Sequence, residues 1–322
     1  MIVTTEDKAS RLMRMRRIWG YGTAIAVSPY LLIKIAWTFG LFMPTNQMGD
    51  PSWRIANAVT MVLAAACILL AMAICRPWGE RLPSWLVALP VWVGTGLLVP
   101  MLLLAPLLGP AAITRDMEAG TADFWVYEQI FVMVSLVGVG ICLPLALAGY
   151  AKTRWPEALV GPIDCGELLP GHTRQLQITL ARFVAGGCIL LSFIKIFWAM
   201  GGTLGIAPAM LDYRDIWWGL LSLSTGVWAF AGAWGLLVIT SRRGSWRFLP
   251  PMAAAWISSG MLFSYNLFNR LSTSRPDAQP APEYPLAQVL TTEAGTVLGV
   301  MMGMILLLVL HDRRRALSGE SV

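Results

Sequence analysis

Two lysines lie inside stretches that are otherwise apolar, and an amine in such a place can do unusual chemistry. Lys34 stands in "YLLIKIAWTFG" (30–40) and Lys195 in "SFIKIFWAMG" (192–201). Both stretches share the pattern K-I-x-W-x-x-G. Because a buried amine gives up its proton more readily than an exposed one, it can relay a proton or form a Schiff base. The pattern therefore indicates two equivalent candidate sites, one in each half of the chain.

Two glutamates can neutralise these lysines. Glu128 and Glu293 each lie near the start of an apolar stretch, and the expected helix directions place them at the depth of the lysines, in the external half of the bilayer. A charge inside a bilayer is costly unless it is paired or hydrated. We therefore expect one lysine–glutamate pair for each half of the chain. The sequence leaves open whether the partners belong to the same half. It also leaves open whether the pairs fix the helix packing or form a solute or ion site.

Aromatic and hydroxyl side chains complete the candidate set. Trp37 and Trp198 follow the lysines by three residues, so they share their helix face and can either cover the ammonium group or simply pack between helices. Tyr30 lies one helical turn before Lys34, whereas Leu191 takes that place in the second half. Thr292 stands directly before Glu293. The candidate binding residues are Lys34, Lys195, Glu128, Glu293, Trp37, Trp198, Tyr30 and Thr292.

The elements that must position these residues are membrane-spanning helices. Of the 322 residues, 57% are hydrophobic and only 13% are charged, whereas soluble domains carry about a quarter charged residues. A span needs about 20 mostly apolar residues. The sequence therefore predicts an all-α membrane protein with eight transmembrane helices, at 18–43, 55–75, 84–108, 124–150, 179–203, 216–240, 248–268 and 287–311.

The distribution of basic residues predicts the orientation. Most of the 24 lysines and arginines fall in the N-terminal segment, in alternate loops such as "RPWGER" (76–81) and "SRRGSWR" (241–247), and in the terminal "HDRRR" (311–315). By the positive-inside rule, these segments and both termini lie in the cytoplasm, which makes this a multi-pass protein of the cell (plasma) membrane. The apolar run after "RLMRMRR" (11–17) is long enough for an uncleaved signal anchor.

Short motifs recur in the same order in the two halves. The K-I-x-W-x-x-G pattern occurs twice, "WVGTGLL" (92–98) matches "WISSGML" (256–262), and Glu128 matches Glu293. We expect a first four-helix repeat at 1–150, a cytoplasmic linker at 151–178 and a second four-helix repeat at 179–322. Since each repeat has an even number of spans, the two repeats would be parallel in the membrane.

The sequence "RPWGERLPSWL" followed by "WVGTGLL", together with K-I-x-W-x-x-G, resembles a group of uncharacterised actinobacterial multi-pass integral membrane proteins. The excess of arginine over lysine and the many Ala, Gly and Trp residues are typical of a GC-rich genome of that kind. The resemblance is closer in the first half than in the second. It implies a source and a topology, and that group brings no assigned activity.

Three functions remain open. The leading hypothesis is transport or permeation of a small solute or ion through a Lys/Glu site between the two repeats. The alternative is a non-catalytic accessory or scaffolding subunit, which binds a membrane-protein partner and whose ion pairs are structural. A membrane-embedded enzyme is third, since only the glutamates could act as acid or base.

The net charge of +6 arises from clusters at span ends, so it does not indicate nucleic-acid binding. The sequence indicates no cofactor and no metal site.

Overall fold

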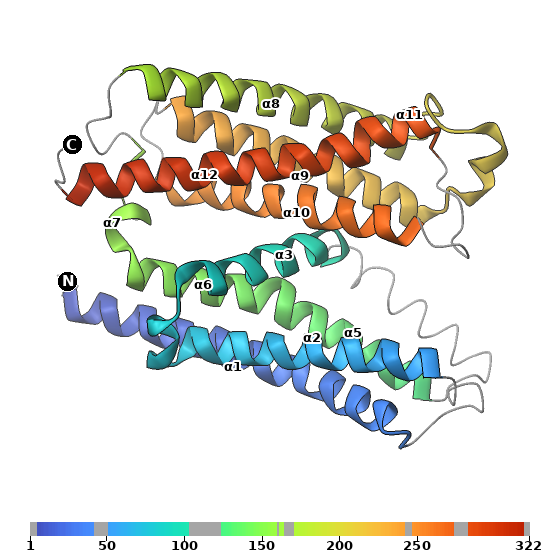
Figure 1. The fold of residues 1–322 in the computed structure, drawn as a ribbon, viewed down its shortest axis with the longest axis horizontal. Helices are drawn as coiled ribbons and strands as arrows, with labels where there is room; N and C mark the ends of the chain where they lie inside the picture. Colours follow the sequence, from blue (N-terminus) through green and yellow to red (C-terminus); the bar gives the residue numbers. More distant parts are fainter. Residues whose placement is uncertain are drawn as a thin grey trace. The chain divides into compact units, whose positions relative to one another are not determined.

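The structure is a computed structural model, and it describes residues 5–41, 51–102, 124–159, 161–163, 171–241, 247–273 and 283–318. Within these ranges the chain is almost entirely helical and has no strand, apart from two isolated β-bridges, Pro162–Arg247 and Ile206–Glu283 (Figure 1). The prediction of an all-α fold is confirmed.

Seven helices in the described part of the chain are long and apolar enough to cross a membrane, as a polytopic membrane protein requires. They are Ser10–Thr38, Trp53–Cys75, Ser84–Leu102, Val126–Arg154, Arg174–Ala199, Ile216–Ser241 and Pro285–Ala316. The eighth predicted span corresponds to helix α10 (Leu249–Thr273), which has 25 residues and is about 38 Å long at 1.5 Å per residue. It is not among the seven because Ser258, Ser259, Ser264 and Asn266 make it more polar.

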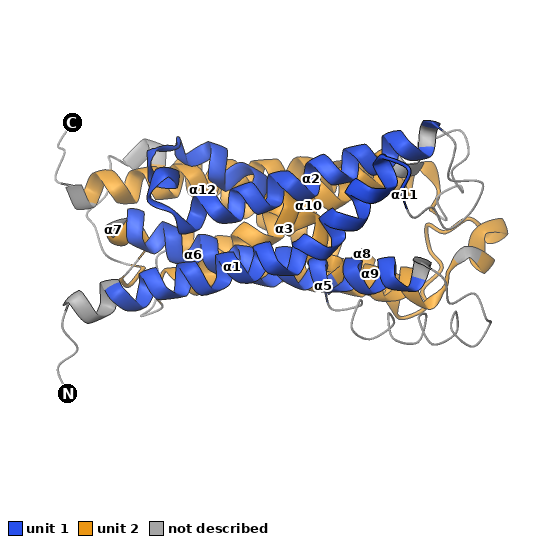
Figure 2. Cartoon of the chain, turned by 90° about the horizontal axis from the view of Figure 1, so that it is seen from below, with its two compact units in different colours: residues 1–91, 102–154 blue, residues 92–101, 155–322 orange. Residues whose placement is uncertain are grey.

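The chain divides into two compact units. Unit 1 comprises residues 1–91 and 102–154, and unit 2 comprises residues 92–101 and 155–322 (Figure 2). The division after Arg154 lies near the start of the segment expected to be a linker. That segment is partly helical, because it contains α7 (Pro156–Leu159) and α8 begins within it, at Gly171.

Helix α1 is the centre of unit 1. It spans Thr5–Thr38 and packs against α2 (Pro51–Cys75), α5 (Phe124–Val137) and α6 (Leu143–Arg154). The short helix η2 (Pro77–Arg81) follows α2. A π-helical turn, η3 (Gly138–Cys142), joins α5 to α6 within one span. Thr23 of α1 donates a hydrogen bond to the carbonyl oxygen of Gly138 in this turn, at 3.1 Å.

Unit 2 is built from α8 (Gly171–Ala199), η4 (Pro208–Tyr213), α9 (Ile216–Ser241), α10, α11 (Pro285–Gln288), η5 (Val289–Glu293) and α12 (Ala294–Ser318). Helices α8 and α9, α9 and α10, and α10 and α12 pack against each other along their lengths. Their facing sides form an apolar core that includes Ala233, Leu262 and Met302. Here too a π-helical turn, η5, interrupts the last span.

Residues 92–101 of α3 (Ser84–Leu102) belong to unit 2 because they fit tightly against α10. Trp92 donates a hydrogen bond from Nε1 to the Ser259 Oγ at 2.9 Å, and its ring stacks on Phe263 with centroids 5.1 Å apart. A Cβ atom on Gly96 would lie 2.1 Å from the backbone carbon of Gly260, so the two helices touch backbone to backbone.

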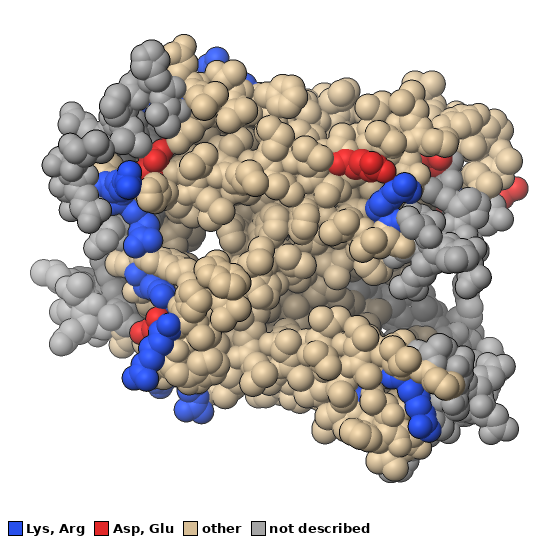
Figure 3. Space-filling view, viewed as in Figure 1, with Lys and Arg blue, Asp and Glu red and all other residues tan. Residues whose placement is uncertain are grey.

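Basic side chains gather at one end of each unit (Figure 3). In unit 1 this is the end where α1 begins, and in unit 2 it is the end where α12 finishes. Arg16 is the buried member of the group in unit 1, with 1% of its surface exposed. Its guanidinium donates hydrogen bonds to the Ile74 carbonyl, Glu80 and Thr153. Which end faces the cytoplasm stays a prediction.

Candidate functional site

The two K-I-x-W-x-x-G motifs end their helices in the same way. Gly40 has φ 77° and Gly201 has φ 96°, the left-handed conformation that glycine adopts without strain. The amide of Gly40 donates to the Trp37 carbonyl at 3.1 Å, and that of Gly201 donates to the Trp198 carbonyl at 3.1 Å. This is a Schellman-type stop, which fixes the tryptophan and the lysine one and two turns before it.

In unit 1, Lys34 is enclosed by partners from three helices. Only 6% of its surface is exposed. Its Nζ donates hydrogen bonds to Glu128 of α5 and to the Oδ1 of Asn57 of α2, the latter at 2.9 Å. The ring of Trp37 lies 4.8 Å from the Nζ and that of Tyr30 lies 5.2 Å from it. All four residues compensate the buried charge, so the ammonium group is well accommodated here.

Trp53, one turn before Asn57 in α2, supports both Asn57 and Trp37. The Asn57 Nδ2 donates to the Trp53 carbonyl at 2.9 Å, one turn earlier in α2. The ring of Trp53 packs against that of Trp37, with centroids 5.3 Å apart. Asn57 was not among the residues predicted from sequence. The signal that could have found it is an amide side chain in an otherwise apolar span, four residues after a tryptophan.

In unit 2, Lys195 has a different and looser environment. It is 8% exposed, and its Nζ lies 3.9 Å from an oxygen of Glu283 and 4.9 Å from the centroid of the Trp198 ring. Among the described residues, no hydrogen bond from its ammonium group is found. A separation of 3.9 Å is beyond direct hydrogen-bond distance, and such gaps are commonly bridged by water.

Glu293, one of the two glutamates expected to pair with the lysines, does not lie beside Lys195. Glu293 pairs with Arg270 of α10 at 3.1 Å, and both side chains are about half exposed. Glu283 takes its place because the segment before α11 is tied to the chain that follows α8. Ile206 and Glu283 form an isolated bridge, and the amide of Tyr284 donates to the Gly205 carbonyl at 2.9 Å. Glu283 was missed from sequence because it lies in a proline-rich loop, outside the predicted spans.

The two units share a second pattern at the start of their next helix. Trp53, Asn57 and Thr60 of α2 have the same spacing as Trp218, Ser222 and Thr225 of α9. The rings of Trp218 and Trp198 lie 5.9 Å apart, so this tryptophan pair repeats the contact seen in unit 1. Ser222 is shorter than Asn57, and Leu191 replaces Tyr30. Lys195 therefore lacks counterparts of two contacts that Lys34 makes, the hydrogen bond to Asn57 and the cation–π contact with Tyr30.

Unit 2 also contains buried polar atoms without a partner among the described residues. Asn266 of α10 is 3% exposed, and its Nδ2 points at Gly295 of α12, where an added Cβ would lie 2.5 Å away. Thr292 is buried in η5, which packs against α10 and α8. Such atoms are usually satisfied by internal water. The partnerless atoms are Thr95 Oγ1, Arg214 Nε, Ser224 Oγ, Ser258 Oγ, Ser264 Oγ and Asn266 Nδ2.

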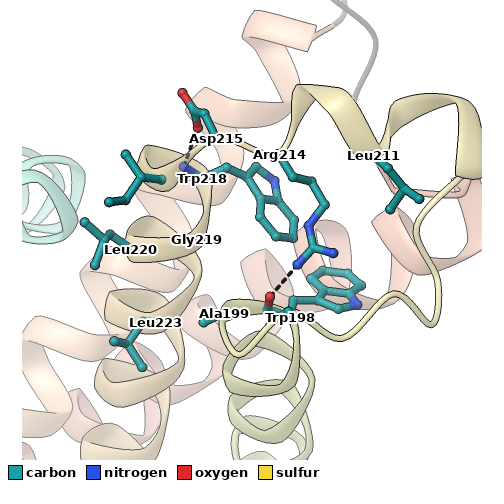
Figure 4. Close-up of a pocket in the computed structure, with 11 residues that line it drawn as sticks. Trp198, Ala199, Leu211, Arg214, Asp215, Trp218, Gly219, Leu220 and Leu223 are labelled. Carbon is teal, nitrogen blue, oxygen red and sulfur yellow. Dashed lines mark hydrogen bonds between the residues drawn. The ribbon is translucent and has the colours of Figure 1, made fainter.

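A pocket of about 470 Å³ opens where α8 ends and α9 begins (Figure 4). Trp198, Arg214 and Trp218 form its polar side, and the Arg214 guanidinium lies over the Trp218 ring at 4.6 Å. Arg214 donates hydrogen bonds to the carbonyls of Gly202 and Trp198, at the end of α8. Neither Lys34 nor Lys195 lines this pocket.

Comparison with known proteins finds no matching protein family, no matching characterised protein and no matching solved structure. The basis for a functional proposal is therefore the chemistry of the chain's own residues.

Proposed function

We propose that the protein is a non-catalytic accessory or scaffolding subunit of the plasma membrane, in which buried lysine–glutamate pairs hold helices together. The observation that carries this proposal is the environment of Lys34. Its ammonium group has Glu128 and Asn57 as hydrogen-bond acceptors and two aromatic rings over it, at 6% exposure. Two of the three donors of this ammonium group are occupied, and aromatic rings and burial restrict access to it, so this pair is better suited to fixing helices than to transport.

We further propose that the chain arose by duplication of a four-helix unit, with parallel repeats and both termini in the cytoplasm. Three features of the two units support this history. Each has the lysine and tryptophan followed by a left-handed glycine. Each pairs that tryptophan with a second one at the start of the next helix. Each has a π-helical turn in its last span.

The paired replacement Lys34→Met with Glu128→Leu tests the structural role. Both charges are removed together, so no uncompensated charge remains in the apolar interior, and such replacements of a buried pair are often neutral. We expect the tagged full-length variant, purified from its native membrane, to form an assembly of the same mass as wild type in native mass spectrometry. Lys34→Met alone is the control and should accumulate poorly. A paired variant that folds normally but loses its assembly would contradict the proposal.

A second function, passage of a small polar solute or ion through unit 2, is favoured by one observation. The Nζ of Lys195 lies 3.9 Å from Glu283, and the Asn266 Nδ2 of the same unit has no hydrogen-bond partner among the described residues. Cysteine accessibility tests it, in a chain whose five native cysteines are replaced. If water reaches this lysine, a small charged thiol reagent should label Lys195→Cys much faster than Lys34→Cys. Equally slow labelling of both variants would count against solute passage.

A further inference from the structure

The pocket between α8 and α9 has the size and position of a ligand site at a membrane surface. Its volume of about 470 Å³ lies within the range of about 300–1,000 Å³ that is typical of small-molecule sites. It lies at the end of one span and the start of the next, with the indole ring of Trp218 on its wall; Trp198 also borders it but is only 1% exposed. Tryptophan is enriched at this level of membrane proteins, where lipid head groups meet the acyl chains.

The polar side of the pocket carries two opposite charges on neighbouring residues. Arg214 lies between the two indole rings; its Nη1 and Nη2 each donate one hydrogen bond to a backbone carbonyl, and its Nε is buried without a hydrogen-bond partner among the described residues. A guanidinium group is well suited to phosphate oxygens. Asp215 accepts a hydrogen bond from the Trp218 amide at 2.8 Å, and its side chain is otherwise exposed at the pocket. A carboxylate beside indole faces is suited to an ammonium group.

The opposite side of the pocket is apolar. Leu220 and Leu223 of α9 extend the wall along the helix, and Leu211 of η4 closes the outer side (Figure 4). Ile216 and Leu223 are 67% and 40% exposed. An exposed apolar strip that continues along a span has the surroundings that an acyl chain requires.

We infer that this pocket binds the head group of a zwitterionic phospholipid. The phosphate lies against the Arg214 guanidinium, the ammonium lies at Asp215 and the Trp218 ring, and one acyl chain runs along Ile216, Leu220 and Leu223. A neighbouring positive and negative charge match a zwitterion and discriminate against a head group that is only anionic, because Asp215 repels it. This inference goes beyond the proposed subunit function and does not depend on it.

Gly219 offers a way to fill the pocket without disturbing the fold. It lines the pocket, and nothing lies within 4 Å of a Cβ atom added to it. The variant Gly219→Leu should therefore occupy the cavity without a clash. Gly186→Leu is the matched control, since Gly186 is also a helical glycine of unit 2 with open space around it and does not line the pocket. Thermal unfolding should show both variants to be folded.

The measurement is native mass spectrometry of the full-length protein released from nanodiscs that contain equal amounts of phosphatidylethanolamine and phosphatidylglycerol. Wild type and Gly186→Leu should retain the zwitterionic lipid over the anionic one by about ten-fold, equivalent to about 1.4 kcal/mol. Gly219→Leu and Arg214→Gln should lose this retention, and Asp215→Asn should bring the ratio of the two lipids toward one. Retention by Gly219→Leu equal to that of Gly186→Leu would overturn the inference, as would no preference in wild type.

One further arm separates a lipid from a soluble head group. Soluble phosphoethanolamine carries the same phosphate and ammonium groups but has no acyl chain. If the apolar wall contributes to binding, millimolar phosphoethanolamine should leave the retained phosphatidylethanolamine unchanged. Displacement of the lipid at that concentration would show that the pocket takes a soluble solute, and the lipid assignment would be wrong.

Discussion

The Nζ of Lys34 and the Oδ1 of Asn57 are joined by a hydrogen bond of 2.9 Å, deep between helices α1 and α2. Together with the bond to Glu128, it gives a buried ammonium group two oxygen acceptors. The matching lysine of unit 2 has Ser222 at the position that corresponds to Asn57, and the described residues give it no hydrogen bond. The Asn57 bond, the direct bond to Glu128 and the Tyr30 ring together separate the well-satisfied ion pair of unit 1 from the loose one of unit 2.

Replacing Asn57 by leucine should destabilise the protein. The apolar side chain has a similar volume, but it removes an acceptor from a buried charge, which costs about 1–3 kcal/mol. Thermal unfolding of the purified protein in detergent measures the effect. Ser222→Ala is the matched control in unit 2 and should have a smaller effect, because no bond to lysine is lost there. Equal changes in the two variants would mean that the Asn57 bond contributes nothing measurable.

A side chain at Gly201 should lower the stability of the protein, although space for it is available. Its φ is 96°, and nothing lies within 4 Å of an added Cβ, so backbone strain is the only cost of Gly201→Ala. That cost is about 1–2 kcal/mol for an L-residue in the left-handed region. Gly219→Ala, at an open position inside α9, should instead leave stability unchanged or raise it. Unfolding temperatures of the two variants test this contrast, and a stable Gly201→Ala would argue against the motif's role as a helix stop.

The close contact between α3 and α10 makes its own prediction. A Cβ on Gly96 would lie 2.1 Å from the backbone of Gly260, whereas a Cβ on Gly94 would meet nothing within 4 Å. Gly96→Ala should therefore force the helices apart, at a cost of about 1–3 kcal/mol. Gly94→Ala should be neutral in the same unfolding assay. If both substitutions were neutral, residues 92–101 would not pack against α10 as described.

Several features of the fold and site could be predicted from the sequence for clear physical reasons. Length and hydropathy are enough to identify helices that cross a membrane, because a span must satisfy its own backbone hydrogen bonds. That Lys34 pairs with a glutamate follows from depth, since a charge inside a bilayer is costly unless it is paired, but depth does not distinguish Glu128 from Glu293. The shared K-I-x-W-x-x-G pattern likewise indicated two equivalent lysines.

The choice of partner for Lys195 could not be predicted. Depth leaves both Glu128 and Glu293 open as partners, but Glu293 pairs with Arg270 on a half-exposed side of its helix and Glu128 pairs with Lys34. Glu283 reaches the lysine because backbone contacts with Ile206 and Gly205 bring its loop to the end of α8. Contacts of this kind depend on the path of a loop, which the hydrophobic pattern does not record. Asn57 was missed for a related reason: hydropathy averages over a span and conceals one amide.

The central claim is that the Lys34–Glu128 pair is structural, and a double-mutant cycle measures it most directly. The free energy of unfolding is compared for wild type, Lys34→Met, Glu128→Leu and the paired variant. Each single change leaves one buried charge without its partner and should cost about 3–5 kcal/mol. The paired change leaves no uncompensated charge and should cost less than either single change, so the sum of the two single costs should exceed the paired cost by more than about 3 kcal/mol. Costs that add to within about 0.5 kcal/mol would show that the two residues do not stabilise each other, and would contradict the claim.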